Sequence, residues 1–369
     1  MFYYLFDYIN EVFNPPGFDL FRYLSFRSIL SAVTGLVLSI YLGPKIIKYL
    51  NKKQIGETIK EDGPATHKSK AGTPTMGGII VILCITISTL LWGDIKSSYI
   101  ILVLAGTCFL ALVGYLDDYL KVVKKYPKGL IARYKLLGQV IVGLVVGFSV
   151  YYLPEFSTFS TQTTLPFFKN LNFDFSYLYI PVVIFIITAT SNAVNLTDGL
   201  DGLAMGTIII VMLALGVMSY ISGNIIYSDY LNIIYLPGSG ELAIFIAALI
   251  GAGLGFLWFN FYPAQVFMGD TGSLALGGAL GIIAILIKKE LLLPILGGIF
   301  FLETISVIIQ RLYFKYTKLR YGQGKRVFRM APIHHHFELL GWSEPKIVMR
   351  FYIITIIVAL MSLASFKIR

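Results

Sequence analysis

Acidic residues at the ends of apolar stretches are the clearest chemical signal in this chain. Asp117 and Asp118 are consecutive and end one such stretch, and Asp270 precedes another. Two adjacent carboxylates repel each other unless a cation or a proton lies between them, and the end of a helix further disfavours their negative charge. A divalent metal ion, or an ammonium group such as that of Lys121, would relieve both costs. A solvated helix end is the structural alternative for this pair.

Two turns rich in Asp, Asn and Gly could supply oxygen ligands and backbone N–H groups. The first contains Asn195, Asp198 and Asp201, and the second covers residues 260–273 and contains Asp270 beside Thr271 and Ser273. Mg²⁺ usually binds one or two carboxylates and completes its shell with water and substrate phosphates, while a helix N-terminus offers N–H donors to an anion. Ordinary Asx turns, and an N-terminal cap in the case of Asp270, are the structural alternatives.

Basic side chains in two further loops could bind phosphate or sugar. Lys68 and Lys70 precede a loop of Thr, Pro and Gly residues, and residues 334–336 are three consecutive histidines. Lysines bind phosphate as point charges, whereas histidine runs favour metal, phosphate or sugar contacts. Lysines in such loops also have a simpler explanation, because membrane proteins carry their basic residues on the cytoplasmic side.

The composition indicates a membrane protein. Of the 369 residues, 56% are hydrophobic and 14% are charged, whereas soluble chains have roughly 45–50% and about 25%. Both cysteines, Cys84 and Cys108, lie inside apolar runs, so neither a disulfide framework nor a CxxC metal site is available. Residues 1–24 are rich in aromatic side chains, which favours a position along the outer membrane interface.

Ten apolar stretches are long enough to cross a bilayer, which takes about 20 residues each. We therefore expect an all-α, polytopic membrane protein in which residues 1–369 form a single domain. The ninth stretch contains Gly297, Gly298 and the lone acid Glu303, which predicts a bend or a break. The stretches are 26–44, 76–93, 98–116, 134–153, 178–194, 203–222, 241–259, 273–288, 291–313 and 347–366.

The basic residues orient these spans. The chain has a net charge of +10, and most of its 30 Lys and Arg residues fall in the segments 45–75, 117–135 and 311–346. The positive-inside rule places these segments in the cytoplasm and both termini outside. All the candidate loops described above then share the cytoplasmic face, where a site for polar, anionic material is expected. Because orientation accounts for the basic excess, no nucleic-acid partner is expected.

Five motifs together resemble the phospho-N-acetylmuramoyl-pentapeptide transferase family, within the polyprenyl-phosphate N-acetylhexosamine-1-phosphate transferases. They occur in the family's order, and the resemblance covers roughly residues 43–366. The aspartate motifs are shared across the superfamily, whereas the TPTMGG and HHHFE segments are more particular to the pentapeptide branch. The motifs are HKSKAGTPTMGG at 67–78, GYLDDYLK at 114–121, NLTDGLDGLA at 195–204, FNFYPAQVFMGDTGS at 259–273 and RMAPIHHHFE at 329–338.

The resemblance implies an enzyme of bacterial peptidoglycan synthesis in the cytoplasmic membrane. It would transfer phospho-MurNAc-pentapeptide from UDP-MurNAc-pentapeptide to undecaprenyl phosphate, forming lipid I and UMP with Mg²⁺, and would be a homodimer. By the family pattern, Asp270 binds the metal, Asp117 is the base or nucleophile-handling residue and a second metal ligand, and Asp118 is its partner at the metal or the lipid phosphate. The implied substrate-binding residues are Lys70, Thr75, Lys121, Lys125, Lys135, Asn195, Asp198, Asp201, Asn260, Phe267, His334 and His335.

Several alternatives stay open. Direct attack by the lipid phosphate and a covalent intermediate on Asp117 are not distinguished by the sequence. A transferase that uses UDP-GlcNAc would share the aspartates, although the HHHFE segment argues against it. An ion-coupled transporter would place ionisable residues near the bilayer midplane, yet Glu303 is the only acid well inside a predicted span. Glu303 is either a packed structural acid or a lining residue of a lipid groove.

Overall fold

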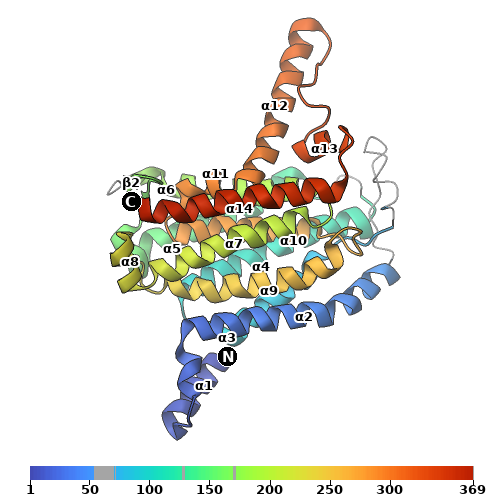
Figure 1. Cartoon of the computed structure of the whole chain (residues 1–369). Coiled ribbons are helices and arrows are strands. Elements are labelled where there is room, and N and C mark those ends of the chain that lie inside the picture. The colour runs from blue at the N-terminus through green and yellow to red at the C-terminus, as the bar shows by residue number, and fades with distance from the viewer. Residues whose placement is uncertain (54–69, 71, 127–128, 169–171, 369) are drawn as a thin grey trace.

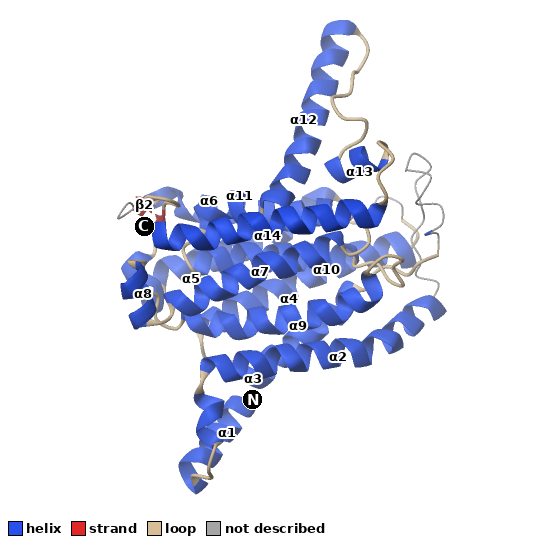
Figure 2. Ribbon diagram, viewed as in Figure 1, coloured by secondary structure: helices blue, strands red, loops and turns tan. Residues whose placement is uncertain are grey.

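The computed structural model describes the chain except for residues 54–69, 71, 127–128, 169–171 and 369. Apolar helices lie side by side in one bundle (Figure 1), and nearly all of the regular structure is helical (Figure 2). Each of the ten predicted spans coincides with a helix or a helix pair. These are α2 (Leu24–Lys52), α3 (Gly78–Trp92), α4 (Ser98–Asp118), α5 (Ala132–Tyr152), α6 (Tyr179–Thr197), α7 (Leu203–Ser222), α9 (Leu242–Asn260), α10 (Gly269–Leu286), α11 (Leu293–Leu296) with α12 (Gly298–Tyr321), and α14 (Glu344–Ile368).

The expectation of an all-α, multi-pass membrane protein is confirmed. Among the described residues, eight helices are long and apolar enough to cross a membrane, and nine if α11 and α12 count as one bent span. The apolar helix α3 has only 15 residues, which is short of the roughly 20 that a full crossing takes. Ten crossings, and termini outside the cell, therefore stay predictions.

Short elements connect or flank the long helices. The strands β1 and β2 pair as a small antiparallel hairpin in which Thr163 lies opposite Phe173. The helix α1 is rich in aromatic residues and leaves the bundle beside α3, where the Phe2 and Trp92 ring centroids are 5.4 Å apart. The remaining bounds are α1 (Phe2–Phe13), α8 (Ile225–Leu231), α13 (Ile333–Glu338), β1 (Gln162–Thr164), β2 (Asn172–Asp174), the π-helix Tyr119–Val123, and the 3-10 helices Phe18–Arg22, Pro154–Phe159, Ser176–Leu178, Ser239–Glu241 and Glu290–Leu292.

The helix α10 forms the centre of the bundle. It packs against α4 on one side and α6 on another, and almost all of its residues are buried. Lipid tails are as apolar as leucine, so helices in a membrane associate through close van der Waals packing, which small residues permit. The glycines of α10 permit this close packing. Neighbouring helices therefore fix the position of α10, whose first turn contains Asp270.

The ninth span is broken, as the sequence predicts. The axes of the segments before and after Gly297 differ by 81°, and α12 projects from the bundle (Figure 1). Two consecutive glycines at this point lack the side chains that favour a continuous helix. Large apolar side chains, including Leu302, Ile305 and Leu312, stay exposed along α12.

One end of the bundle holds the described parts of the candidate loops. At this end, called the site end, α4, α6 and α9 finish and α7, α10 and α14 begin. The two chain termini lie toward the opposite end (Figure 1). Loops that are far apart in the sequence are therefore close together at the site end, as far as the structure describes them.

Candidate active site

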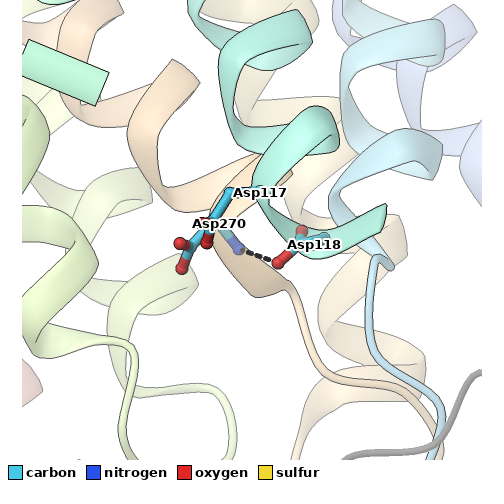
Figure 3. Close-up of side chains that lie close together, drawn as sticks. All are labelled: Asp117, Asp118 and Asp270. Carbon is cyan, nitrogen blue, oxygen red and sulfur yellow. Dashed lines mark hydrogen bonds between the residues drawn. The ribbon is translucent and has the colours of Figure 1, made fainter. Parts of the chain in front are cut away.

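Three aspartates meet at the site end (Figure 3). Asp117 and Asp118 end α4, and Asp270 lies in the first turn of α10. Each offers a carboxylate oxygen, and these oxygens all lie within 4.8 Å of one another. Asp117 is fully buried and the side chain of Asp270 is 15% exposed. The predicted acidic cluster therefore forms, and it could hold a metal ion.

The close approach of α4 to α10 brings these carboxylates together. A Cβ atom on Gly114 would lie 2.1 Å from the carbonyl oxygen of Asp270, so only glycine fits at this position. The φ angle of Gly269 is +74°, which favours glycine, and a Cβ atom there would lie 2.8 Å from Asp118 Oδ2. The backbone of α10 thus begins in direct contact with the end of α4.

Asp118 holds the start of α10. Its Oδ1 accepts a hydrogen bond from the Asp270 backbone N–H at 3.1 Å, and its Oδ2 accepts from the Thr271 backbone N–H at 2.9 Å and the Thr271 hydroxyl at 2.7 Å. A carboxylate at a helix N-terminus satisfies unpaired N–H groups and lies at the positive end of the helix dipole. The capping role considered for Asp270 is therefore filled by Asp118, and the Asp270 carboxylate is not used to cap the helix.

Two lysines lie between Asp117 and Asp270. Lys121 forms an ion pair with Asp117 and lies 3.0 Å from Asp270 Oδ2, while Lys135 lies 2.8 Å and 2.6 Å from the same two carboxylates. The other Asp117 oxygen accepts a hydrogen bond from the Leu130 backbone N–H at 2.6 Å. Three carboxylates against two ammonium groups leave a formal charge of −1, which attracts a divalent cation.

Asn195 orients Asp270 from α6. Its side-chain nitrogen donates to Asp270 Oδ1 and to the Ser273 hydroxyl, each at 2.8 Å. Asn195 lies inside α6, so the predicted turn is confined to residues 198–202. Asp270 thus has one oxygen held by an amide and the other by lysines, which fixes the plane of its carboxylate.

The donor set fits a hard divalent metal such as Mg²⁺. Asp117 and Asp270 turn toward each other, whereas both oxygens of Asp118 are used at α10 (Figure 3). Mg²⁺ needs only one or two carboxylates when substrate phosphates and water complete its shell. Asp117 and Asp270 are therefore the residues that would hold it.

Lys70 belongs to a second polar group at the same end. Its ammonium lies 2.6 Å from Asp201 Oδ1 and 2.7 Å from Glu344 Oε1, and this Glu344 oxygen also accepts from the Asp201 backbone N–H at 2.6 Å. Burial opposes the charge on Lys70, but the hydrogen bonds to both acids outweigh it and raise the pKa of Lys70. Phe267 lies beside this group, with its ring centroid 5.9 Å from the ammonium. Glu344 carries no motif signal, and the sequence did not predict it.

The loop before α3 and the loop before α10 lie against each other. The backbone N–H of Phe267 donates to the Pro74 carbonyl, that of Gly77 donates to the Phe267 carbonyl, and both distances are 2.8 Å. Thr75 is buried in this contact. Asn260 donates to the Val266 carbonyl at 2.9 Å, so its amide supports the loop. Residues 67–69 and 71 of the first motif lie outside the described residues.

The other predicted site residues are Asp198 and Lys125, which lie in loops at the ends of α6 and α4, and the two histidines His334 and His335. Asp198 is half-buried at the end of α6, while Lys125 is exposed and none of its described contacts reaches the aspartates. His334 is fully buried with its Nδ1 3.0 Å from Glu303 Oε1. His335 Nδ1 lies 2.7 Å from Glu338 Oε2. Of these two histidine rings, that of His334 is buried and that of His335 is partly accessible.

The bundle and its buried carboxylates define an integral membrane protein with a metal-competent acidic site at one membrane face. Residues 99–288 match the family model for glycosyl transferase family 4, and residues 70–82 match the phospho-N-acetylmuramoyl-pentapeptide-transferase signature 1. Proteins of that name from Pelodictyon phaeoclathratiforme, Chlorobium limicola and Chloroherpeton thalassium are 55%, 54% and 52% identical to this chain, over the full length of both sequences. The chain belongs to the phospho-N-acetylmuramoyl-pentapeptide-transferase family.

Proposed function

We propose that this protein transfers phospho-MurNAc-pentapeptide from UDP-MurNAc-pentapeptide to undecaprenyl phosphate, releasing UMP and forming lipid I for peptidoglycan synthesis. The observation that carries the proposal is the cluster of Asp117, Asp270, Lys121 and Lys135 at the end of a membrane bundle. One substrate has a lipid tail and the other is a soluble anion, so their reaction needs a charged site at a membrane surface. The full-length identity to relatives named for this transfer supports the same conclusion.

The site residues have distinct roles in this reaction. Asp117 and Asp270 would hold Mg²⁺, which offsets negative charge on the diphosphate when bound. Lys121 and Lys135 already lie between the two carboxylates, so their ammonium groups can contact phosphoryl oxygens without a large movement. Phosphoryl transfer depends mainly on positioning and charge stabilisation, which is what these fixed side chains provide.

Direct attack by the lipid phosphate is the favoured route. An oxygen of undecaprenyl phosphate attacks the β-phosphorus of the donor, the bond from that phosphorus to the bridging oxygen breaks, and UMP leaves with the electron pair. Asp117 is poorly suited to be the nucleophile, because one oxygen accepts the Leu130 N–H and the other is paired with two lysines.

The proposal places the protein in the bacterial cytoplasmic membrane, with the site end in the cytoplasm. The donor is made of charged, water-soluble groups, so the basic loops and the site must share the face that the donor reaches. The outward orientation of both termini and the homodimer stay predictions from the positive-inside rule and the family resemblance.

A transfer assay in reconstituted membranes tests the proposal. Undecaprenyl phosphate and Mg²⁺ are supplied, UDP-MurNAc-pentapeptide and UDP-GlcNAc are offered separately, and UMP release is followed. We expect UMP from the pentapeptide donor only, with the signal removed by EDTA and by Asp270→Asn. UMP from UDP-GlcNAc alone would instead assign the chain to the alternative transferase reaction, and no UMP from either donor in folded protein would overturn the proposal.

A further inference from the structure

Glu303 and His334 form a buried pair that the reaction described above does not use. Glu303 follows the break at Gly297 by less than two helical turns, and His334 lies in α13. Both residues are 0% exposed, and Nδ1 of the histidine is 3.0 Å from Oε1 of the glutamate. Within the described residues, the glutamate oxygens and the histidine nitrogens have no further hydrogen-bond partner. Burying such groups is costly, so the pair requires an explanation.

Gly199 lies against the other edge of the His334 ring. A Cβ atom on Gly199 would lie 2.2 Å from Nε2 and 2.7 Å from Cε1 of that ring. Gly199 belongs to the turn between α6 and α7 that carries Asp198 and Asp201. Because the ring is enclosed between Glu303 and this turn, a change in the position of the ring would displace the turn.

His334 also contacts the more accessible histidine. The ring centroids of His334 and His335 are 4.1 Å apart, and His335 Nδ1 is paired with Glu338 Oε2. The buried ring therefore lies between two elements assigned to the donor, the α6–α7 turn and His335. A fully buried ring cannot itself contact the donor in this arrangement.

We propose that Glu303 and His334 are positioning residues that fix the α6–α7 turn and His335 for binding of the UDP donor. The inference rests on the function proposed above and revises the expected role of His334 from substrate contact to support. It also links the start of the projecting helix α12 to the donor half of the site through the contact between Glu303 Oε1 and His334 Nδ1.

A buried acid at the opposite end provides a matched control. Glu290 is 4% exposed, lies just before α11, and pairs with the Thr163 hydroxyl. Glu290→Gln and Glu303→Gln therefore make the same chemical change in two buried acids, one at the start of the ninth span and one just after its break. Only Glu303 contacts an element of the site.

Steady-state kinetics of the full-length, reconstituted protein separate positioning from stability. For Glu303→Gln we expect the donor KM and the Kd for UMP to rise about tenfold, with kcat and the undecaprenyl phosphate KM changed by less than about twofold. For Glu290→Gln we expect a lower unfolding temperature with an unchanged donor KM. A donor KM for Glu303→Gln that stays at the native value would overturn the inference. Absence of UMP release by the native chain would instead overturn the proposed function, and the inference with it.

A double-mutant cycle provides a second test that does not depend on Glu303. Gly199→Ala places a methyl group in the space of the His334 ring, so it should raise the donor KM in the native background. In the His334→Ala background the ring is gone, and the same glycine substitution should then have little further effect. Equal effects of Gly199→Ala in both backgrounds would show that the ring does not hold the turn.

Discussion

At the scale of single residues, Asp117 and Asp118 are neighbours with different tasks. Asp117 faces Asp270 and two lysines, whereas Asp118 binds the first N–H groups of α10. For Asp117→Asn we expect turnover to fall about 100-fold or more, because charge at the reacting centre is lost, while the unfolding temperature stays near native. For Asp118→Asn we expect turnover to fall and the protein to lose about 2 kcal/mol of stability, because an amide cannot accept all three hydrogen bonds.

Thermal unfolding in detergent beside the UMP assay checks this difference. The two variants make the same atom replacement one residue apart, so each serves as the control for the other. An Asp118→Asn protein that unfolds like the native chain but has no activity would contradict the positioning role and place Asp118 at the substrate.

Lys70 supplies the second residue-scale prediction. Lys70→Met leaves Asp201 and Glu344 without their cation, and we expect a loss of about 3 kcal/mol, because breaking a buried ion pair leaves unpaired charge. Glu344→Gln in the same chain should recover part of that loss. Unfolding measurements on the two single variants and the double variant give the coupling, and strictly additive effects would contradict the pairing.

The stabilisation of the fold by Lys70 should decrease at alkaline pH. The pKa of Lys70 is raised above its ordinary value of 10.5 in the folded protein. A group with a raised folded pKa stabilises the fold fully below its unfolded pKa and loses that effect as the pH rises through the folded value. On the alkaline side, the stability difference between native protein and Lys70→Met should therefore shrink only above about pH 10.5, where the ammonium begins to lose its proton. On the acidic side, protonation of the partner carboxylates removes the same ion pairs, so the contradicting outcome is a difference that already shrinks as the pH rises from about 7 to 10.

The residues of the site could be predicted from the sequence, but many of their contact partners could not. Asp270, Lys121 and Asn195 were predicted from motifs, and the structure brings them within hydrogen-bonding distance. Glu344 and the contact between Glu303 and His334 were not predicted, because each depends on helices that are far apart in the chain. A local sequence pattern cannot predict which distant loop Glu303 or Glu344 contacts in the folded chain.

At the scale of elements, the fit between α4 and α10 determines the geometry of the cluster. In Gly114→Ala the new methyl group would meet the Asp270 carbonyl at 2.1 Å, so the start of α10 must move. We expect about 1–3 kcal/mol of destabilisation and roughly a 100-fold loss of turnover, since a displacement of about 1 Å at a reacting group can cost that much.

Gly147→Ala in α5 is the matched control for this element-scale prediction. A Cβ atom there would lie 3.4 Å from Ile180 Cγ2, which is an ordinary van der Waals distance. Both variants replace a glycine with alanine inside a membrane helix, so UMP release and unfolding temperature can be compared directly. Native turnover in Gly114→Ala would show that the α4–α10 contact does not set the position of Asp270.

The helices themselves follow from composition, but their directions do not. Continuous apolar runs predict every long helix, and the glycines at 297 and 298 predict the break in the ninth span. The 81° turn after the break depends on packing of α12 against α6 and α13, which involves distant parts of the chain. Hydropathy therefore predicts that a helix such as α12 forms, but its direction depends on tertiary packing.

At the scale of the whole molecule, the distribution of charge determines which way the bundle faces. The site end carries basic residues that include Lys52, Lys121 and Lys135, and the opposite end carries the β1–β2 hairpin and the start of α6. If the site end faces the cytoplasm, a soluble donor reaches the aspartates from inside the cell, while the acceptor reaches them through the membrane. The chemistry therefore requires the orientation that the positive-inside rule predicts.

Labelling of single cysteines in membrane vesicles tests that orientation. In a chain with Cys84 and Cys108 replaced by alanine, one cysteine is introduced at Tyr177, which is 94% exposed at the opposite end, or at Lys325, which is exposed after α12. A membrane-impermeant maleimide should label Tyr177→Cys in right-side-out vesicles and Lys325→Cys in inverted vesicles, and both sites after detergent is added. The reverse pattern would place the aspartates outside the cell, where a cytoplasmic nucleotide donor could not reach them, and would contradict the proposed function together with the topology.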